Sequence, residues 1–171
     1  MYGVQLLHMQ QILQPRGEKY DLLMNSLNIE LHQVREVLLC LFGCLYHHEN
    51  IGKVRAGLDM KNKEAIANAM ELIEIMVRKD FAGQFNTMYE TTTIEHRCKA
   101  LKNILPANFH LRLETILHNI LSEKPINYNY WTKACSLYTS KKQHHTIETE
   151  LIEKYLTSSS SVLREIAQYA L

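Results

Sequence analysis

Apolar residues recur along almost the whole chain at spacings of three and four positions, which is the spacing of one face of an α-helix. The pattern predicts helices over the ranges 4–13, 18–27, 29–47, 50–58, 62–77, 79–89, 93–105, 110–121, 128–140, 145–157 and 160–171. The breaks between these segments are short, such as Pro15-Arg16-Gly17 and Leu105-Pro106-Ala107-Asn108. The serines at 158–161 offer N-cap hydroxyls to the last helix. The pattern therefore favours an all-α chain with short connections.

Composition supports this fold class. The 171 residues include only 6 Gly and 3 Pro, too few for the many turns of a β-sandwich, a barrel or a disulfide knot. With 46% hydrophobic and 22% charged residues, the chain also has enough apolar surface to fold rather than stay disordered. The glycines are not closely spaced, so the sequence contains no phosphate-cradling loop.

An alanine returns at a nearly constant interval in successive predicted helices. The four positions, separated by 31, 34 and 33 residues, are Ala69, Ala100, Ala134 and Ala167. An arginine stands three residues earlier at Arg97 and Arg164, whereas Ile66 and Trp131 replace it in the other two. This period predicts an α-α superhelix of antiparallel helix pairs, a HEAT/armadillo-like solenoid, in which a small residue allows close helix contact and the arginine bonds to the next repeat. Chance alignment of alanines is the alternative.

The stretch 35–105 contains the residues of a more specific resemblance. They are Leu45-Tyr46-His47-His48-Glu49-Asn50-Ile51, then Lys53-Val54-Arg55-Ala56-Gly57-Leu58, and then Ala65-Ile66-Ala67-Asn68-Ala69-Met70-Glu71-Leu72-Ile73-Glu74-Ile75-Met76. This pattern resembles the HEAT-like helical-repeat domain that follows the membrane transporter in bacterial ATP/ADP-carrier-like translocases. The segments 130–138 and 162–171 resemble the ordinary HEAT repeats that follow it.

The resemblance implies a single HEAT-like domain over 1–171, with N-terminal helices at 1–30 and repeats at 31–171, excised from a longer membrane transporter. It implies a non-catalytic scaffold or regulatory role on the cytoplasmic side of the inner membrane, through contact with a protein partner or with other domains of the same chain. ATP and ADP would bind only to the absent transporter region. The alternative is a stand-alone HEAT interaction module or a HEAT-type nucleic-acid-binding protein.

Charge bears on that alternative. With 19 Lys and Arg against 18 Asp and Glu, the net charge is +1, which is not typical of a nucleic-acid-binding protein. The most apolar stretch, 37–46, is too short to cross a bilayer. We therefore expect no nucleic-acid partner and no membrane span in this segment.

The cysteines give one candidate metal site. Cys40, Cys44, His47 and His48 have the spacing of one helix face and could bind zinc. Because both cysteines lie in the most apolar stretch, core packing is the favoured interpretation. The four thiols of Cys40, Cys44, Cys98 and Cys135 are interpreted as small buried hydrophobic groups in a reducing compartment.

The remaining candidates have a simpler alternative in each case. Cys98, His96 and Glu95 combine a nucleophile, a base and an acid, but residues two apart on a helix point in different directions. His144 and His145 could sense pH or bind a metal, although a solvated loop is favoured. The aromatic group Tyr128, Tyr130 and Trp131 could be a partner hot spot, although stacking between repeats is favoured.

Two charge runs, one formed by Glu71, Glu74 and Lys79 and the other by Arg97, Lys99 and Lys102, are interpreted as solvated surface. We assign no catalytic residue, no metal ligand and no cofactor, and expect the chain not to be an enzyme. If a specialised surface exists, the region of Gly43, Gly52 and Gly57 is where we expect it, because the glycines depart there from a regular repeat.

Overall fold

The computed structural model describes residues 1–46, 48–60, 62–106, 109–123 and 126–171. These residues are all-helical, with no strand in the described ranges. In chain order the elements are α1 (Tyr2–Leu13), η1 (Gln14–Tyr20), α2 (Asp21–Leu45), α3 (His48–Asp59), α4 (Lys63–Met76), α5 (Lys79–Tyr89), α6 (Ile94–Ala100), η2 (Lys102–Ile104), α7 (Leu113–Ser122), α8 (Tyr130–Lys142), α9 (Thr149–Glu153) and α10 (Ser161–Ala170). The predicted all-α class is confirmed.

The long helix α2 corrects the prediction of two helices over 18–27 and 29–47. It runs without a break for 25 residues and continues through residue 30, where the sequence suggested the start of the repeats. Asn28, which usually disfavours a helix interior, accepts a hydrogen bond of 2.7 Å from Gln10 on α1 instead of competing with its own backbone. Ser26 likewise donates to the Leu23 carbonyl within the helix. Tertiary contacts thus outweigh the weak local propensity at 26–28.

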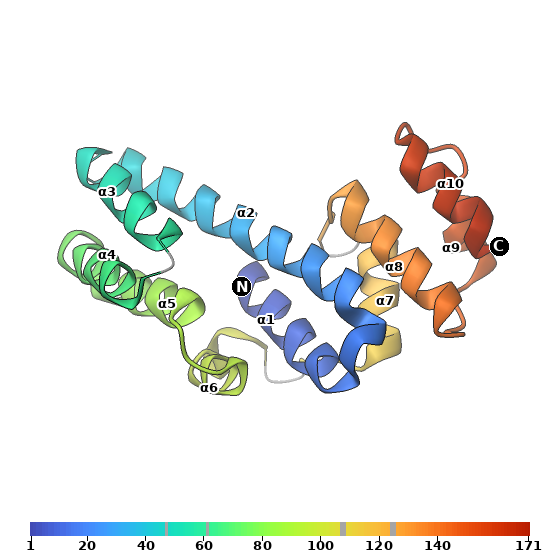
Figure 1. Cartoon of the computed structure of the whole chain (residues 1–171), viewed down its shortest axis with the longest axis horizontal. Helices are drawn as coiled ribbons and strands as arrows, with labels where there is room; N and C mark the ends of the chain where they lie inside the picture. The colour runs from blue at the N-terminus through green and yellow to red at the C-terminus, as the bar shows by residue number, and fades with distance from the viewer. Residues whose placement is uncertain (47, 61, 107–108, 124–125) are drawn as a thin grey trace.

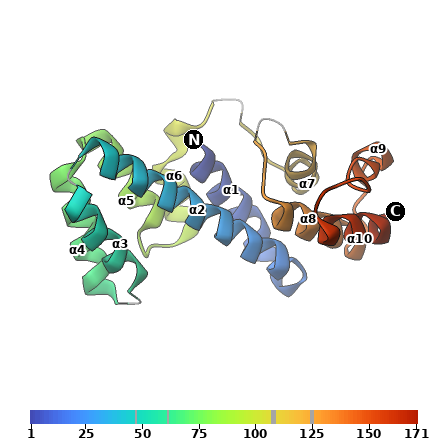
Figure 2. The same cartoon turned by 90° about the horizontal axis from the view of Figure 1, so that it is seen from above.

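Three buried clusters follow one another along the molecule, and α2 contributes to two of them (Figures 1 and 2). The central cluster joins α1 to the N-terminal half of α2 and to α5, α6, α7 and α8. A second cluster joins the C-terminal half of α2, through Leu39 and Phe42, to α3, α4 and α5. The third joins α7 and α8 to α9 and α10. The molecule is therefore elongated, with α2 lying across its first two clusters.

Two other predicted helices are shorter than the sequence indicated. The segment 93–105 forms α6 only to Ala100 and then a 3-10 turn over Lys102–Ile104. Leu105 is extended, as expected for the residue before Pro106. The segment 145–157 is helical only over Thr149–Glu153. His144 has a φ of 56°, outside the helical region, and the His145 N–H donates to the Ser140 carbonyl. This contact ends α8 and directs the chain away from a helix.

The repeat alanines differ in their surroundings. Ala69, Ala134 and Ala167 are buried, and the last two lie in the third cluster, where α8 packs against α10. Ala100 is exposed, so the reason given for a small residue does not hold there. The arginines also differ from expectation, since Arg97 donates to the Met88 carbonyl at 3.1 Å and Arg164 to the Ser158 carbonyl at 2.6 Å. Both bind an earlier segment rather than the next repeat.

The described helices contain no stretch that is both long enough and apolar enough to cross a membrane. The longest helix, α2, carries the charged residues Asp21, Glu30, Arg35 and Glu36.

Candidate interaction surface

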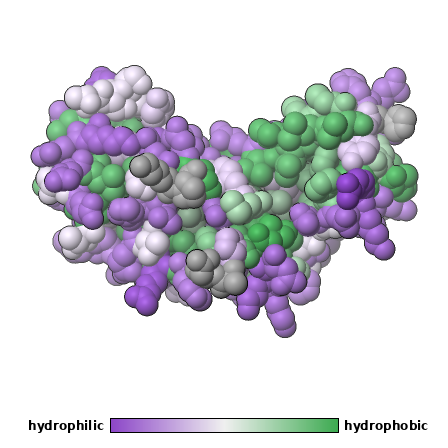
Figure 3. Space-filling model, turned by 180° about the vertical axis from the view of Figure 1, so that it is seen from behind, coloured by the Kyte–Doolittle hydropathy of each residue, from purple (hydrophilic) through white to green (hydrophobic). Residues whose placement is uncertain are grey.

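The C-terminal half of α2 exposes a row of apolar side chains and thiols, which we call the α2 ridge. Its members are Val37, Cys40, Leu41, Cys44 and Leu45. Val37 is 59% exposed, Leu41 51% and Leu45 72%, and both cysteines are exposed. Their spacing of three and four residues places them on one side of the helix. Figure 3 shows an apolar area on this part of the molecule, at the upper right. Large contiguous apolar patches are often interaction sites in folded proteins, which makes the ridge a candidate for one.

The ridge is the continuation of a helix face that is covered farther along α2. Helix α8 packs on the N-terminal half of α2, antiparallel to it, so that the first turn of α8 reaches Glu30 and the Tyr20 hydroxyl lies 2.7 Å from Nε2 of His145 beyond its end. Val37 lies two helical turns after Glu30 on the same face, and Cys44 two turns later. One helix face is thus occupied by α8 up to Glu30. Beyond Glu30 the ridge side chains are exposed, and Arg55 of α3 contacts Cys40 Sγ at 3.6 Å.

Glu30 lies where the contact between α8 and α2 ends along α2. It is 4% exposed. Its Oε1 accepts from the Asn129 backbone N–H at 2.9 Å and from the Thr132 hydroxyl at 2.9 Å, and its Oε2 accepts from the Tyr2 hydroxyl at 3.0 Å. These bonds satisfy a buried carboxylate without a cation. Burial raises the pKa of the Tyr2 phenol, and the charge of Glu30 and its hydrogen bond raise it further. The start of α8 is therefore tied to the middle of α2.

The far end of the ridge opens into an apolar hollow of about 470 Å³. It is lined by Leu45 and Tyr46 from the end of α2, Asn50 from α3, and Ile75 and Met76 from the end of α4. Ile75 is 74% exposed. A hollow that continues an apolar row is suited to receive a large side chain of a docked segment.

The first turn of α8 exposes two large aromatic side chains. Tyr130 is 54% exposed and Trp131 46%. Tyr128, by contrast, is 3% exposed and makes an edge-on contact with the Tyr2 ring at 5.7 Å between centroids. The favoured stacking interpretation thus fits Tyr128, while no ring contact of the described residues includes Trp131. Tyr130 and Trp131 agree better with the hot-spot alternative.

The core interpretation of Cys40 and Cys44 is wrong, since both thiols lie on the exposed ridge. The apolar stretch 37–46 has more than one face. Leu39 and Phe42 are buried in the second cluster, and Leu38 and Tyr46 pack against it while partly buried. For the zinc alternative, His47 lies outside the described residues, and no group of three metal-ligating side chains occurs within the part of the chain that is described. Cys98 and Cys135 are buried as expected.

The candidate catalytic set is not brought together. Cys98 is 1% exposed, and burial raises the pKa of its thiol to about 11, which keeps it protonated. His96 points to solvent, with Nδ1 at 3.3 Å from Glu90 Oε1. Glu95 is exposed on the same helix. A buried thiol and an outward imidazole cannot act as nucleophile and base.

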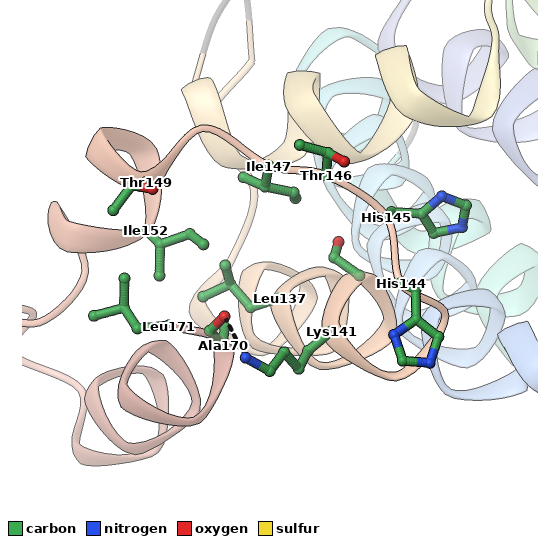
Figure 4. Close-up of a pocket in the computed structure, with 11 residues that line it drawn as sticks. Leu137, Lys141, His144, His145, Thr146, Ile147, Thr149, Ile152, Ala170 and Leu171 are labelled. Atoms are coloured by element: carbon green, nitrogen blue, oxygen red, sulfur yellow. Dashed lines mark hydrogen bonds between the residues drawn. The ribbon is translucent and has the colours of Figure 1, made fainter.

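The pair at the end of α8 lines a separate hollow of about 430 Å³ (Figure 4). His144 is exposed, whereas His145 is partly buried and hydrogen-bonded to Tyr20. The other walls are a mixture of apolar and polar side chains from α8, from the connection to α9, from α9 and from the end of α10. Lys141 Nζ donates to the Ala170 carbonyl at 3.2 Å. His145 therefore connects η1 to this loop instead of lying free in solvent.

The two charge runs are only partly solvated. Glu71, Lys79, Lys99 and Lys102 are exposed as predicted. Glu74, however, accepts a hydrogen bond of 2.9 Å from Asn86 on α5, and Arg97 bonds to the Met88 carbonyl. These two side chains hold helices together.

Two buried charged residues, Lys133 and Glu30, were not predicted from the sequence. Lys133 is 1% exposed, and its ammonium lies 2.5 Å from Glu123 Oε1, 2.7 Å from Asn127 Oδ1 and over the Tyr130 ring at 5.5 Å. Glu123 also binds Lys154 at 2.6 Å, and the bonds from these two lysines lower the pKa of its carboxyl. Lys133 and Glu30 both occur in helices where charged residues are normally exposed. Only the polar positions on otherwise apolar faces could have revealed them.

No protein-family model, no curated protein and no solved structure matches this chain.

Proposed function

We propose that this chain is a non-catalytic interaction domain that holds an amphipathic helix of a partner segment along the α2 ridge. The observation that supports it is the continuity of the ridge with the face of α2 that α8 already covers. We propose a helix as the partner because the same face of α2 already packs against the helix α8. A partner helix on the ridge would continue the line of α8 along α2. The apolar hollow at Leu45 would receive an anchoring side chain.

The wider assignment rests on the resemblance of segment 35–105. We propose a HEAT-like superhelix that forms the domain of an ATP/ADP-translocase-like membrane protein, on the cytoplasmic side of the inner membrane. The antiparallel contact of α3 with α4 and the buried Ala134 and Ala167 support a repeat architecture, and the exposed Ala100 weakens it. In this proposal the partner helix belongs to another domain of the same protein or to a protein bound to it.

The two ridge cysteines provide the test, because the rate at which each thiol is modified reports whether the ridge is exposed. We expect a maleimide reagent to modify Cys40 and Cys44 rapidly in the purified chain and to leave the buried Cys98 and Cys135 unmodified. In intact cells that produce the protein, an occupied ridge would slow the modification of Cys40 and Cys44 by roughly tenfold or more.

The matched control is S159C, at an exposed position on the loop before α10, which should be modified equally fast in both settings. Equal rates for Cys40 and Cys44 in cells and in the purified chain would contradict the docking proposal. Separate fractionation of cells tests the translocase assignment. We expect the native protein to sediment with the inner membrane and to resist alkaline extraction, and its release into the soluble fraction would exclude that assignment without affecting the docking proposal.

A further inference from the structure

We propose that a groove between α1, α6 and the segment before α7 binds a small organic phosphate, with its apolar body in the groove and its phosphate at the rim. The groove has a volume of about 1060 Å³, which lies just above the usual range of about 300–1,000 Å³ for small-molecule sites. Its walls come from His8 and Ile12 on α1, from Cys98 and Lys99 on α6, and from described residues before α7, namely 105–106 and 109–112. It lies apart from the α2 ridge and has no part in the docking proposed above.

The floor of the groove is apolar. Ile12, Leu105 and Leu111 are partly buried and pack against the central cluster, while Cys98 belongs to that cluster. Phe109 is half-buried and lies edge-on to the His8 ring, with 6.1 Å between the centroids. A flat apolar group can therefore be enclosed between an aromatic ring and aliphatic side chains.

The rim of the groove concentrates positive charge. Lys99, Lys102 and Arg112 line it together with His110, and the only carboxylate in the described lining is Glu95. None of these three cations takes part in an ion pair of the described residues. This is notable in a chain whose net charge is only +1 and whose other charged clusters, at Glu36 and Glu123, are paired. Three unpaired cations around one opening suit a dianion such as a phosphate.

His8 adds a polar group inside the groove. Its Nε2 is buried and has no hydrogen-bond partner among the described residues. Burial lowers the pKa of the imidazole, so the ring is neutral at neutral pH and either donates or accepts at Nε2 according to its tautomer. A buried polar atom without a partner is costly in a folded protein, and a ligand hydroxyl or ester oxygen would satisfy it. The groove thus offers one neutral polar contact inside and three charged contacts outside.

Calorimetric titration with phenyl phosphate tests the site, because this probe carries an aromatic ring and a dianion. We expect saturable binding with a dissociation constant at or below about 1 mM. K99A and K102A should each weaken binding roughly tenfold through loss of a charge-assisted contact, and H8F should weaken it several-fold while it keeps a ring at that position. Inorganic phosphate, which lacks the apolar body, should bind at least tenfold more weakly than phenyl phosphate.

The matched control is K53A, which removes an exposed lysine on α3 away from the groove and should leave binding unchanged. Circular dichroism and the resistance of Cys98 to maleimide verify that each variant is folded. Absence of binding at about 10 mM phenyl phosphate would overturn the proposal. So would equal binding of inorganic phosphate, or an equal loss in K53A and K99A, because each would mean that the groove itself is not recognised.

Discussion

At the scale of single residues, Gly57 is a position where the fold leaves no room for a side chain beside a neighbouring backbone. A Cβ atom there would lie 2.9 Å from the Ala65 carbonyl oxygen and 3.0 Å from the Ala69 Cβ, both on α4. The backbone of α4 cannot move aside without disturbing the second cluster. The glycine therefore permits the close contact of α3 with α4, and Ala69, one of the repeat alanines, completes it.

We expect G57A to lower the free energy of unfolding by about 1–2 kcal/mol, since overpacking outweighs the better helix propensity of alanine. The control is G52A on the same helix, where a Cβ meets nothing within 4 Å. That change should raise the free energy of unfolding by up to about 1 kcal/mol. Urea denaturation of both variants measures the difference, and a G57A variant as stable as G52A would contradict the close contact.

At the scale of elements, the ends of the helices agree with their sequence signals better than their lengths do. The Asn62, Thr93, Asn129 and Ser160 side chains each cap a helix by accepting a backbone N–H. The predicted bounds of the helices 62–77, 79–89 and 160–171 are close to the observed bounds of α4, α5 and α10, because the apolar spacing and the capping residues agree there. The unbroken α2 could not be predicted, because the hydrogen bond of Asn28 to Gln10 joins residues of different helices.

The cap of α10 gives a test at this scale. Ser160 Oγ accepts from the Leu163 N–H, and Leu163 and Ala167 pack α10 on α8. We expect S160A to destabilise the chain by about 1 kcal/mol and to speed amide hydrogen exchange in α10 first. The neighbouring exposed Ser159 provides the comparison, since S159A should leave exchange in α10 unchanged. Equal exchange in the two variants would show that the cap does not stabilise α10.

At the scale of the whole molecule, the sequence predicted the helical class but not which apolar faces are covered. The stretch 37–46 reads as core in every position, yet only part of it is buried. The contact of α8 with α2 extends no farther than Glu30, where α8 begins, and α3 and α5 cover a different side. Which face of α2 is buried depends on where helices from distant parts of the chain begin and end. The spacing of apolar residues along α2 carries no information about that. The ridge flanks Gly43, one of the three glycines around which a specialised surface is expected, and that expectation stays a prediction.

The buried cysteine thiols and tyrosine phenols predict how the stability of the molecule changes at alkaline pH. Burial raises the pKa of Cys98 and Cys135 from the ordinary 9.0 to about 11, and it also raises the pKa of Tyr89, Tyr128 and Tyr155. Above pH 9 the unfolded chain releases these protons while the folded chain retains them. The stabilisation is therefore complete below about pH 9 and is lost as the pH rises toward 11.

We expect the melting temperature to fall steeply between about pH 9 and 11, and to fall less steeply in C135A, which lacks one of the titrating thiols. The comparison concerns the slope with pH and not the absolute stability, which C135A also lowers through a cavity. A melting temperature that is constant over this range would contradict the burial of these groups.

The length of α2 has a mechanical consequence. Its 25 residues correspond to a rod of about 38 Å that is embedded at one end in the central cluster and at the other in the second cluster. A stack of short helix pairs bends at every joint, but a rod shared by two clusters removes the joint between them. We expect bending to be concentrated instead beyond α8, where only α9 and α10 extend the molecule. A segment docked on the ridge would thus meet a stiff support rather than a flexible one.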